Sequence, residues 1–217
     1  MTKALFLDRD GVINEDLGYV YRSEDFKLID GVIDFCKEMQ GRGYEIIVIT
    51  NQSGIARGYY TESDFEKITA HMVDLFASAG VTITDVFHCP SLEGPDRKPA
   101  PGLFLKAREK YGIDMAASVN IGDKDRDLAA GRAAGVGVNI LFDGNWPSTA
   151  RWMGRQERHS GRHAPSAADC RGGDFRGEGR GGCLPRMNCM RDGRRTSGRS
   201  LISLMGLLLS NLFIRPG

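Results

Sequence analysis

Strand and helix patterns alternate along the first two thirds of this chain. Residues 45–50, Glu-Ile-Ile-Val-Ile-Thr, form a nearly continuous β-branched run, which is typical of a strand buried on both faces. Similar apolar runs and helical spacings of apolar residues predict strands at 4–7, 45–50, 81–88, 118–121 and 138–142, and helices at 31–41, 61–79, 103–111 and 125–134. This alternation predicts an α/β fold with a doubly wound parallel sheet.

Two aspartates directly follow the first predicted strand. Asp8 and Asp10 stand two residues apart and Gly11 comes next. Side chains two apart in a strand point to the same side, and a glycine lets the backbone turn sharply. Carboxylates this close repel each other, so a metal ion or a shared proton is expected between them. An acidic loop that caps a helix is the simpler interpretation, and the rest of the chain makes it less favourable.

Charge divides the chain into two unlike parts. Residues 1–150 hold 16 Lys and Arg against 23 Asp and Glu, a net charge of −7, whereas residues 151–217 hold 13 Arg, no Lys and 5 acids, a net charge of +8. We expect no nucleic-acid partner for the acidic part, and a magnesium site suits it. We therefore predict one domain at 1–147 and an irregular Arg/Gly-rich tail at 148–217.

The tail contains RGGDFRGEGRGG and few apolar residues before Leu201, so it is expected to be disordered. One functional interpretation is that this basic tail binds nucleic acid. The absence of Lys and the abrupt change of composition near Ala150 fit translation in a wrong reading frame better. The apolar run at 201–214 is too short to span a bilayer, so no membrane partner is expected.

Nothing at the start of the chain resembles a signal peptide, because the first apolar run is short and contains Asp8. The five cysteines form no regular framework, and Cys36 lies on an apolar helical face. We therefore expect a cytoplasmic protein.

Four polar clusters each follow a predicted strand. They are Asp8 with Asp10, Thr50 to Gly54, Arg97 with Lys98, and Gly122 to Lys124. In open parallel sheets, ligands bind at the carboxyl ends of the strands. Each cluster alone could be a turn, a surface loop or a helix start, but their common placement predicts one site.

The residue types in these clusters suit phosphoryl transfer. Asp8, Asp10 and Asp123 offer the hard oxygen ligands that Mg²⁺ prefers. Thr50 offers a hydroxyl and the turn after it offers backbone N–H groups to phosphate oxygens. Lys98 can neutralise a phosphoryl group as a point charge. The planar fork of an arginine such as Arg97 can hold a second anionic group. Positioning and charge neutralisation do most of the catalysis in such reactions.

Four motifs carry a family resemblance. DRDGVIN at 8–14, TNQSGIARG at 50–58, RKP-x-PG at 97–102 and GDK-x-x-D at 122–127 resemble the four motifs of the haloacid dehalogenase superfamily. Within it they resemble the heptose 1,7-bisphosphate 7-phosphatases, with the histidinol-phosphate phosphatases as close relatives. The resemblance covers residues 2–146.

The resemblance implies a role for each catalytic residue. Asp8 would be the nucleophile that forms an aspartyl-phosphate, and Asp10 the general acid and base. Asp8, the backbone carbonyl of Asp10, and Asp123 would hold Mg²⁺, while Thr50 and Lys98 would stabilise the phosphoryl group. Asp127 is expected to support the site rather than to bind metal.

The resemblance also implies a substrate site and a minimal cap that leaves the site open. Residues expected to contact substrate are Asp16, Tyr19, Asn51, Gln52, Ser53, Arg97 and Lys124. The implied function is removal of the 7-phosphate from D-glycero-D-manno-heptose 1,7-bisphosphate in ADP- or GDP-heptose synthesis for lipopolysaccharide. The partner is then a small-molecule sugar phosphate, and we expect a monomer. The residues leave the anomer open, and histidinol phosphate is the alternative substrate.

One loop departs from the family. Many members carry a zinc loop of four Cys and His ligands just before RKP, but this chain reads HCPSLEGPDRKP, with Cys89 as its only thiol. Tetrahedral zinc requires about four ligands. We therefore predict no zinc.

Overall fold

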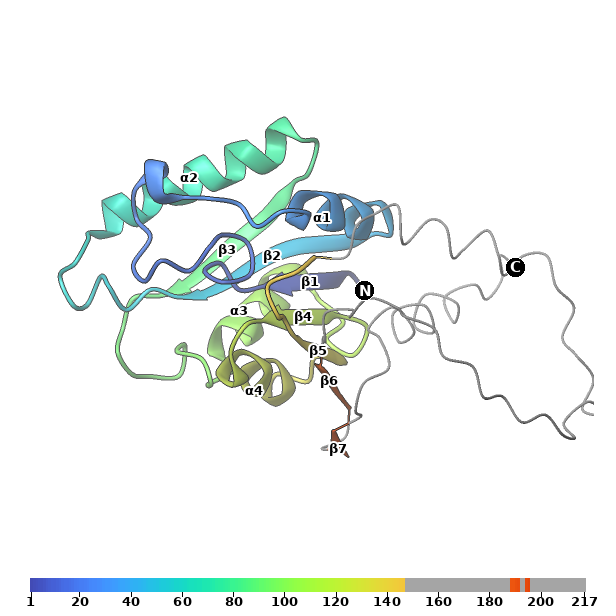
Figure 1. The fold of residues 1–217 in the computed structure, drawn as a ribbon. Helices are drawn as coiled ribbons and strands as arrows, with labels where there is room; N and C mark the ends of the chain where they lie inside the picture. The colour runs from blue at the N-terminus through green and yellow to red at the C-terminus, as the bar shows by residue number, and fades with distance from the viewer. Residues whose placement is uncertain (147–187, 192–193, 196–217) are drawn as a thin grey trace, which may run out of the picture.

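A central sheet dominates the computed structural model, which describes residues 1–146, 188–191 and 194–195 (Figure 1). In these residues the strand order is β3-β2-β1-β4-β5-β6-β7. The strands are β1 Lys3–Leu7, β2 Tyr44–Asn51, β3 Ile83–Cys89, β4 Val119–Gly122, β5 Val138–Leu141, β6 Asn188–Arg191 and β7 Arg194–Arg195. The first five strands are parallel, and β6 and β7 add antiparallel pairs at one edge.

Helices cover both faces of the sheet, as the alternating pattern predicts. The helices are α1 Val32–Gly41, α2 Glu62–Ser78, α3 Gly102–Tyr111 and α4 Asp125–Ala133, with a short 3₁₀ turn, η1, at Ser23–Asp25. Figure 1 shows α1 and α2 on one side and α3 and α4 on the other. Alternate residues of the buried strands divide between these sides: Leu5 and Leu7 pack with α1 and α2, whereas Phe6 packs with Phe104 of α3. The predicted doubly wound α/β fold is confirmed.

Every strand and helix predicted within residues 1–146 is present, and each end differs from its prediction by at most two residues. The start of α2 shows why. The Thr61 Oγ1 accepts a hydrogen bond from the Asp64 N–H at 3.2 Å, and an Asp64 carboxylate oxygen accepts one from the Thr61 N–H at 3.0 Å. This reciprocal capping box satisfies two backbone donors that the helix itself leaves unpaired.

Residues 15–28 form a flap between β1 and α1. Its two ends are tied together where the Glu15 N–H donates to the Lys27 carbonyl at 2.9 Å and Asn14 forms a bridge with Leu28. Val20 and Phe26 anchor it in the core. The flap is therefore a loop closed at its base, which matches the predicted minimal cap.

Most of the predicted tail at 148–217, with its predicted disorder and its possible nucleic-acid binding, lies outside the described residues. Where the structure describes it, β6 and β7 are strands rather than irregular chain. The reason is that β5 would otherwise present an unpaired edge, and β6 pairs with it. In the described part of the chain, no helix is both long enough and apolar enough to cross a membrane.

Candidate active site

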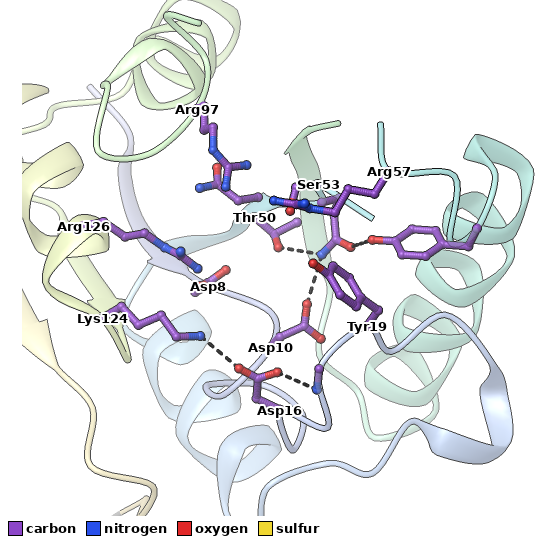
Figure 2. Close-up of a pocket in the computed structure, with 14 residues that line it drawn as sticks. Asp8, Asp10, Asp16, Tyr19, Thr50, Ser53, Arg57, Arg97, Lys124 and Arg126 are labelled. Atoms are coloured by element: carbon purple, nitrogen blue, oxygen red, sulfur yellow. Dashed lines mark hydrogen bonds and ion pairs between the residues drawn. The ribbon is translucent and has the colours of Figure 1, made fainter. Parts of the chain in front are cut away.

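The carboxyl ends of the central strands meet at one pocket, which has a volume of about 380 Å³ (Figure 2). That volume is within the range of about 300–1,000 Å³ that is usual for small-molecule sites. Ten of the twelve predicted site residues line it: Asp8, Asp10, Asp16, Tyr19, Thr50, Asn51, Gln52, Ser53, Arg97 and Lys124. The other two, Lys98 and Asp123, lie beside Asp8. The structure thus brings the predicted residues together.

Asp8 is held rigidly at the end of β1. Its backbone N–H donates to the Ile121 carbonyl of β4 at 3.0 Å, and Asp8 is only 6% exposed. The Lys98 ammonium lies 3.0 Å from Asp8 Oδ1 and 2.7 Å from Asp127 Oδ1, and it donates to the Ile49 carbonyl at 2.8 Å. These contacts account for all three N–H donors of Lys98, so its ammonium group is held in one position.

Asn51 fixes the backbone of Lys98. Its side-chain N–H donates to the Lys98 carbonyl at 3.0 Å, and its side-chain oxygen accepts the Lys98 N–H at 3.1 Å. This pair of hydrogen bonds joins the end of β2 to the loop after β3. Asn51 therefore positions the lysine that faces the nucleophile.

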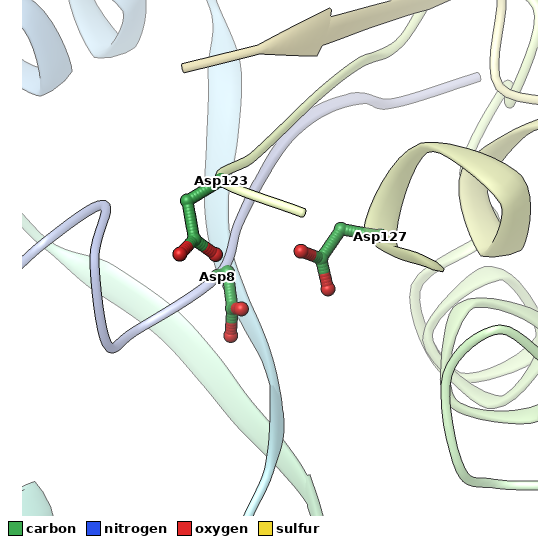
Figure 3. Close-up of side chains that lie close together, drawn as sticks. All are labelled: Asp8, Asp123 and Asp127. Atoms are coloured by element: carbon green, nitrogen blue, oxygen red, sulfur yellow. The ribbon is translucent and has the colours of Figure 1, made fainter. Parts of the chain in front are cut away.

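Three carboxylates lie close together near Asp8 (Figure 3). Oxygens of Asp8, Asp123 and Asp127 lie within 4.8 Å of one another. Burial, together with the negative charge of Asp8, raises the pKa of both Asp123 and Asp127. Asp127 already has two partners, Lys98 and the Lys124 N–H at 3.0 Å. Asp127 thus anchors the lysine and the start of α4, as expected for a supporting residue.

The buried Oδ1 atoms of Asp123 and Asp127 both lack a hydrogen-bond donor among the described residues. They differ because Asp127 Oδ1 lies 2.7 Å from the Lys98 ammonium, whereas Asp123 Oδ1 has no such cation in the described part of the chain. Gly11 makes room for Asp123: a Cβ on Gly11 would stand 2.5 Å from Asp123 Oδ2, and its φ of +84° favours glycine. An unpartnered oxygen next to the charged Asp8 fits a divalent cation. Asp8 and Asp123 are therefore the acids that could hold Mg²⁺.

Asp10 is bound by a buried arginine. The Arg9 Nη2 lies 2.9 Å and 3.0 Å from the two oxygens of Asp10 and donates to the Val20 carbonyl of the flap at 2.7 Å. The Asn14 amide donates to Asp10 Oδ1 at 3.0 Å. Arg9 is 1% exposed. The flap and the predicted general acid are thus fixed by one guanidinium group.

Gln52 links Asp10 to Thr50. Its side-chain N–H₂ donates to Asp10 Oδ2 at 3.0 Å and to Thr50 Oγ1 at 2.8 Å. The Tyr60 hydroxyl donates to the Gln52 side-chain oxygen at 2.5 Å, which orients the amide. Burial raises the pKa of Tyr60 to about 12, so this hydroxyl remains a donor well into the alkaline range. The side chain of Gln52, which was predicted to contact substrate, thus forms hydrogen bonds with Asp10, Thr50 and Tyr60.

Lys124 and Asp16 close the lower rim of the pocket. The Lys124 ammonium lies 2.9 Å from Asp16 Oδ2 in the flap and 3.1 Å from Asp123 Oδ2. Burial disfavours the charge of Asp16, but hydrogen bonds from Lys124 and the Gly18 N–H outweigh it and lower its pKa. Tyr19 stands at the mouth, 45% exposed, with its ring edge-on to Tyr59.

The structure adds residues to which the sequence assigned no role. Arg57, Tyr60 and Arg126 line the pocket, and Arg9 supports it from beneath. Arg9 and Arg57 stand inside the motifs DRDGVIN and TNQSGIARG, and Arg126 occupies a variable position of GDK-x-x-D. Three charged side chains within motif segments were a signal that could have identified them.

The loop before Arg97 was predicted to hold no zinc, and this stays a prediction. In the structure, the His88 Nε2 contacts Glu62 Oε1 at 2.5 Å, and the Cys89 thiol lies 3.8 Å from the Ser91 carbonyl. Arg97 also donates to the Ser91 carbonyl, at 3.0 Å. The loop is therefore held by its own polar contacts and by one to α2.

The sequence is similar to that of one family of hydrolases and to phosphatases of known name. The family model described as haloacid dehalogenase-like hydrolase matches residues 2–135. A D-glycero-alpha-D-manno-heptose-1,7-bisphosphate 7-phosphatase of Campylobacter jejuni is 50% identical over 143 residues, which cover 65% of this chain and 83% of that protein. A D-glycero-beta-D-manno-heptose-1,7-bisphosphate 7-phosphatase of Escherichia coli K12 is 45% identical over 156 residues, covering 67% and 82%.

Two solved structures are similar in fold. A HAD-like phosphatase from Mesorhizobium loti matches with a TM-score of 0.63 and 33% identity, covering 68% of this chain and 76% of that one. D,D-heptose 1,7-bisphosphate phosphatase from B. bronchiseptica, solved with magnesium and phosphate, matches with a TM-score of 0.58 and 30% identity, covering 61% and 76%.

Proposed function

The chain belongs to the haloacid dehalogenase-like hydrolase family, and from that premise we propose that it is a Mg²⁺-dependent phosphatase that removes the 7-phosphate of D-glycero-D-manno-heptose 1,7-bisphosphate. The observation that carries the proposal is the arrangement around Asp8, which lies 3.0 Å from the Lys98 ammonium and beside the unpartnered oxygen of Asp123. Relatives named for this reaction, 43–50% identical over most of their length, support the substrate.

Asp8 and Asp123, with the backbone carbonyl of Asp10, would hold the Mg²⁺. The bound cation supplies charge neutralisation for the phosphate and for the two acids. Its presence with phosphate in the B. bronchiseptica enzyme supports this assignment. Lys98 and the Thr50 hydroxyl then stabilise the remaining charge on the transferred group.

The first half of the reaction moves the phosphoryl group to the protein. A carboxylate oxygen of Asp8 attacks phosphorus, and the bond between phosphorus and the sugar O7 breaks. Asp10, in its protonated form, gives its proton to that departing oxygen, so the sugar leaves as an alcohol. The products of this half are the heptose 1-phosphate and an aspartyl-phosphate at Asp8.

The second half restores Asp8. Asp10, now a carboxylate, takes a proton from water, whose oxygen attacks phosphorus and releases inorganic phosphate. Arg9, Asn14 and Gln52 all bind the Asp10 carboxylate, which supports its assignment as a positioned acid and base. The same contacts keep Asp10 between the flap and β2 in both halves of the reaction.

We infer that residues 1–147 are the phosphatase unit. The family match at 2–135 and the span of the pocket residues, from Asp8 to Arg126, support this boundary. We also propose that the protein is a monomer and that it acts in the cytoplasm; the free thiols of Cys36 and Cys89 support that compartment.

The test is phosphate release from the α and β anomers of heptose 1,7-bisphosphate and from histidinol phosphate, with Mg²⁺ or with EDTA. Asp8→Asn is compared with Asp74→Asn, a change of an exposed acid on α2. We expect Mg²⁺-dependent release from a heptose bisphosphate that is lost in Asp8→Asn and retained in Asp74→Asn. Faster release from histidinol phosphate, or no release from any substrate by the folded protein, would refute the proposal.

A further inference from the structure

The acids of the pocket already have cationic partners. The pairs are Asp8 with Lys98, Asp10 with Arg9, and Asp16 with Lys124, at 2.9–3.0 Å. Each of these three acids thus has a cationic side chain beside it. Further cations that line the pocket and form no ion pair of their own can bind an anionic ligand, although Arg126 also adds to the positive field that lowers the pKa of Asp16.

Three arginines line the same pocket without an ion pair to a carboxylate in the described residues: Arg57, Arg97 and Arg126. Figure 2 shows their guanidinium ends turned toward the space above Asp8, with Arg126 on one side and Arg57 on the other. Arg97 makes one hydrogen bond, to the Ser91 carbonyl. The Nε of Arg126 is buried and has no hydrogen-bond partner among the described residues.

A buried guanidinium N–H without an acceptor is costly, because it has lost water and gained nothing in exchange. Such a donor at the wall of a polar pocket indicates that a ligand supplies the acceptor. The planar fork of arginine matches phosphate oxygens in a bidentate manner. The chemistry that fits Arg126 is therefore a phosphate group.

We propose that Arg126 and Arg57 bind the second phosphate of the substrate, the one that is not transferred. The proposal rests on the function proposed above, in which Lys98, Thr50 and the cation serve the transferred phosphate. A bisphosphate brings a second dianion of about −2 charge, for which those groups have no remaining charge. Arg126 and Arg57 are then specificity-determining residues that distinguish a bisphosphate from a monophosphate.

The fold holds Arg126 firmly enough for this role. Arg126 lies in the first turn of α4, directly before Asp127. The Asp127 carboxylate caps the start of this helix by accepting a hydrogen bond from the Lys124 N–H at 3.0 Å. Arg57 comes from a different segment, the loop after β2, where its N–H donates to the Ser53 carbonyl at 3.2 Å. Two arginines from separate elements can thus contact one phosphate from two sides.

The first test compares two substrates that differ only in that phosphate. We expect Arg126→Gln and Arg57→Gln to lower the ratio of kcat/KM for heptose 1,7-bisphosphate over heptose 7-phosphate by about tenfold or more each. Arg126→Lys keeps the charge and should recover part of the ratio. The control is Arg108→Gln, an exposed arginine on α3 outside the pocket, which should leave the ratio at the wild-type value.

The second test is binding without turnover. In the Asp8→Asn background, calorimetry with the two heptose phosphates should show that adding Arg126→Gln or Arg57→Gln weakens the bisphosphate by about tenfold relative to the monophosphate. A wild-type ratio in both variants, or equal losses for both ligands, would overturn the inference while leaving the proposed function intact. If the wild-type chain hydrolyses no heptose phosphate, the proposed function fails, and the binding experiment still decides whether these arginines hold the second phosphate.

Discussion

Lys98 holds its ammonium 3.0 Å from the carboxylate of Asp8, and the two residues follow different strands of the sheet. The same ammonium also contacts Asp127, so one side chain joins the ends of β1, β3 and α4. Its side chain is only 1% exposed. The position of the lysine is thus set by the nucleophile and by the acid that supports it.

Lys98→Met should reduce kcat by about 10²–10³-fold, the usual loss when one group that stabilises transition-state charge is removed. It should also cost about 3–5 kcal/mol of folding stability, because two buried carboxylates lose their cation. Phosphate release and thermal unfolding measure the two effects. The matched control is Lys106→Met, an exposed lysine on α3 that pairs with Asp96. Equal effects of the two changes on kcat would contradict the assigned role.

Tyr60→Phe should lower kcat several-fold, because the Gln52 amide loses the hydrogen bond that orients it toward Asp10 and Thr50. The Gln52 oxygen left without a donor should cost about 1–3 kcal/mol of stability. Steady-state kinetics and chemical denaturation check this. Tyr59→Phe changes the neighbouring, exposed tyrosine and should be close to neutral. A wild-type kcat for Tyr60→Phe would show that Gln52 needs no such support.

Alkaline pH should destabilise the protein through the same tyrosine. Burial raises the pKa of Tyr60 to about 12, above the ordinary value of 10, so the folded protein retains this proton where the unfolded chain releases it. The contribution to stability is therefore complete below pH 10 and is lost as the pH rises toward about 12. Urea denaturation at pH 9 to 11.5 should show a steeper decline for wild type than for Tyr60→Phe. Parallel curves would contradict this expectation.

Magnesium should raise the melting temperature of the wild-type protein, since it binds the folded state alone. At a concentration 100 times its Kd the gain is about 2.7 kcal/mol. Asp123→Asn should abolish this gain and leave the metal-free protein at least as stable, because burial and the charge of Asp8 disfavour the Asp123 carboxylate, as its raised pKa indicates. Asp125→Asn, an exposed neighbour, should keep the Mg²⁺ response. A full response in Asp123→Asn would exclude Asp123 as a ligand.

Much of the fold was predictable because the buried strands have a simple signature. Ile47 and Ile49 face α3 while Ile46 and Val48 face α1 and α2, so both faces of β2 are apolar and the run 45–50 is continuous. The predicted strand therefore ends within one residue of the observed one. The edge extension by β6 was not predicted, because the pairing of a short Arg-containing segment depends on the free edge of β5 and has no local pattern.

Some residues of the site were predictable from the sequence and others were not. Asp8 and Asp123 follow parallel strands and Thr50 lies at the end of one, and the rule for strand ends places the three together. Arg9 escaped prediction because its partner Val20 lies in the flap, whose path has no periodic pattern. No role was predicted for Arg126, because the direction of a side chain in the first turn of a helix depends on how that helix packs on the sheet. Long-range geometry, rather than residue type, decides both.

The backbone of Asp8 has a consequence for how the catalytic centre responds to solvent. β1 lies between β2 and β4, and the Asp8 amide donates to the Ile121 carbonyl at 3.0 Å. Local opening cannot release this amide while the neighbouring strands remain paired, so its proton should exchange with deuterium only when the whole domain unfolds. Mass spectrometry or NMR should therefore find the Asp8 amide among the slowest to exchange, whereas flap amides such as that of Gly18 exchange early. The nucleophile would then remain in place for as long as the domain stays folded.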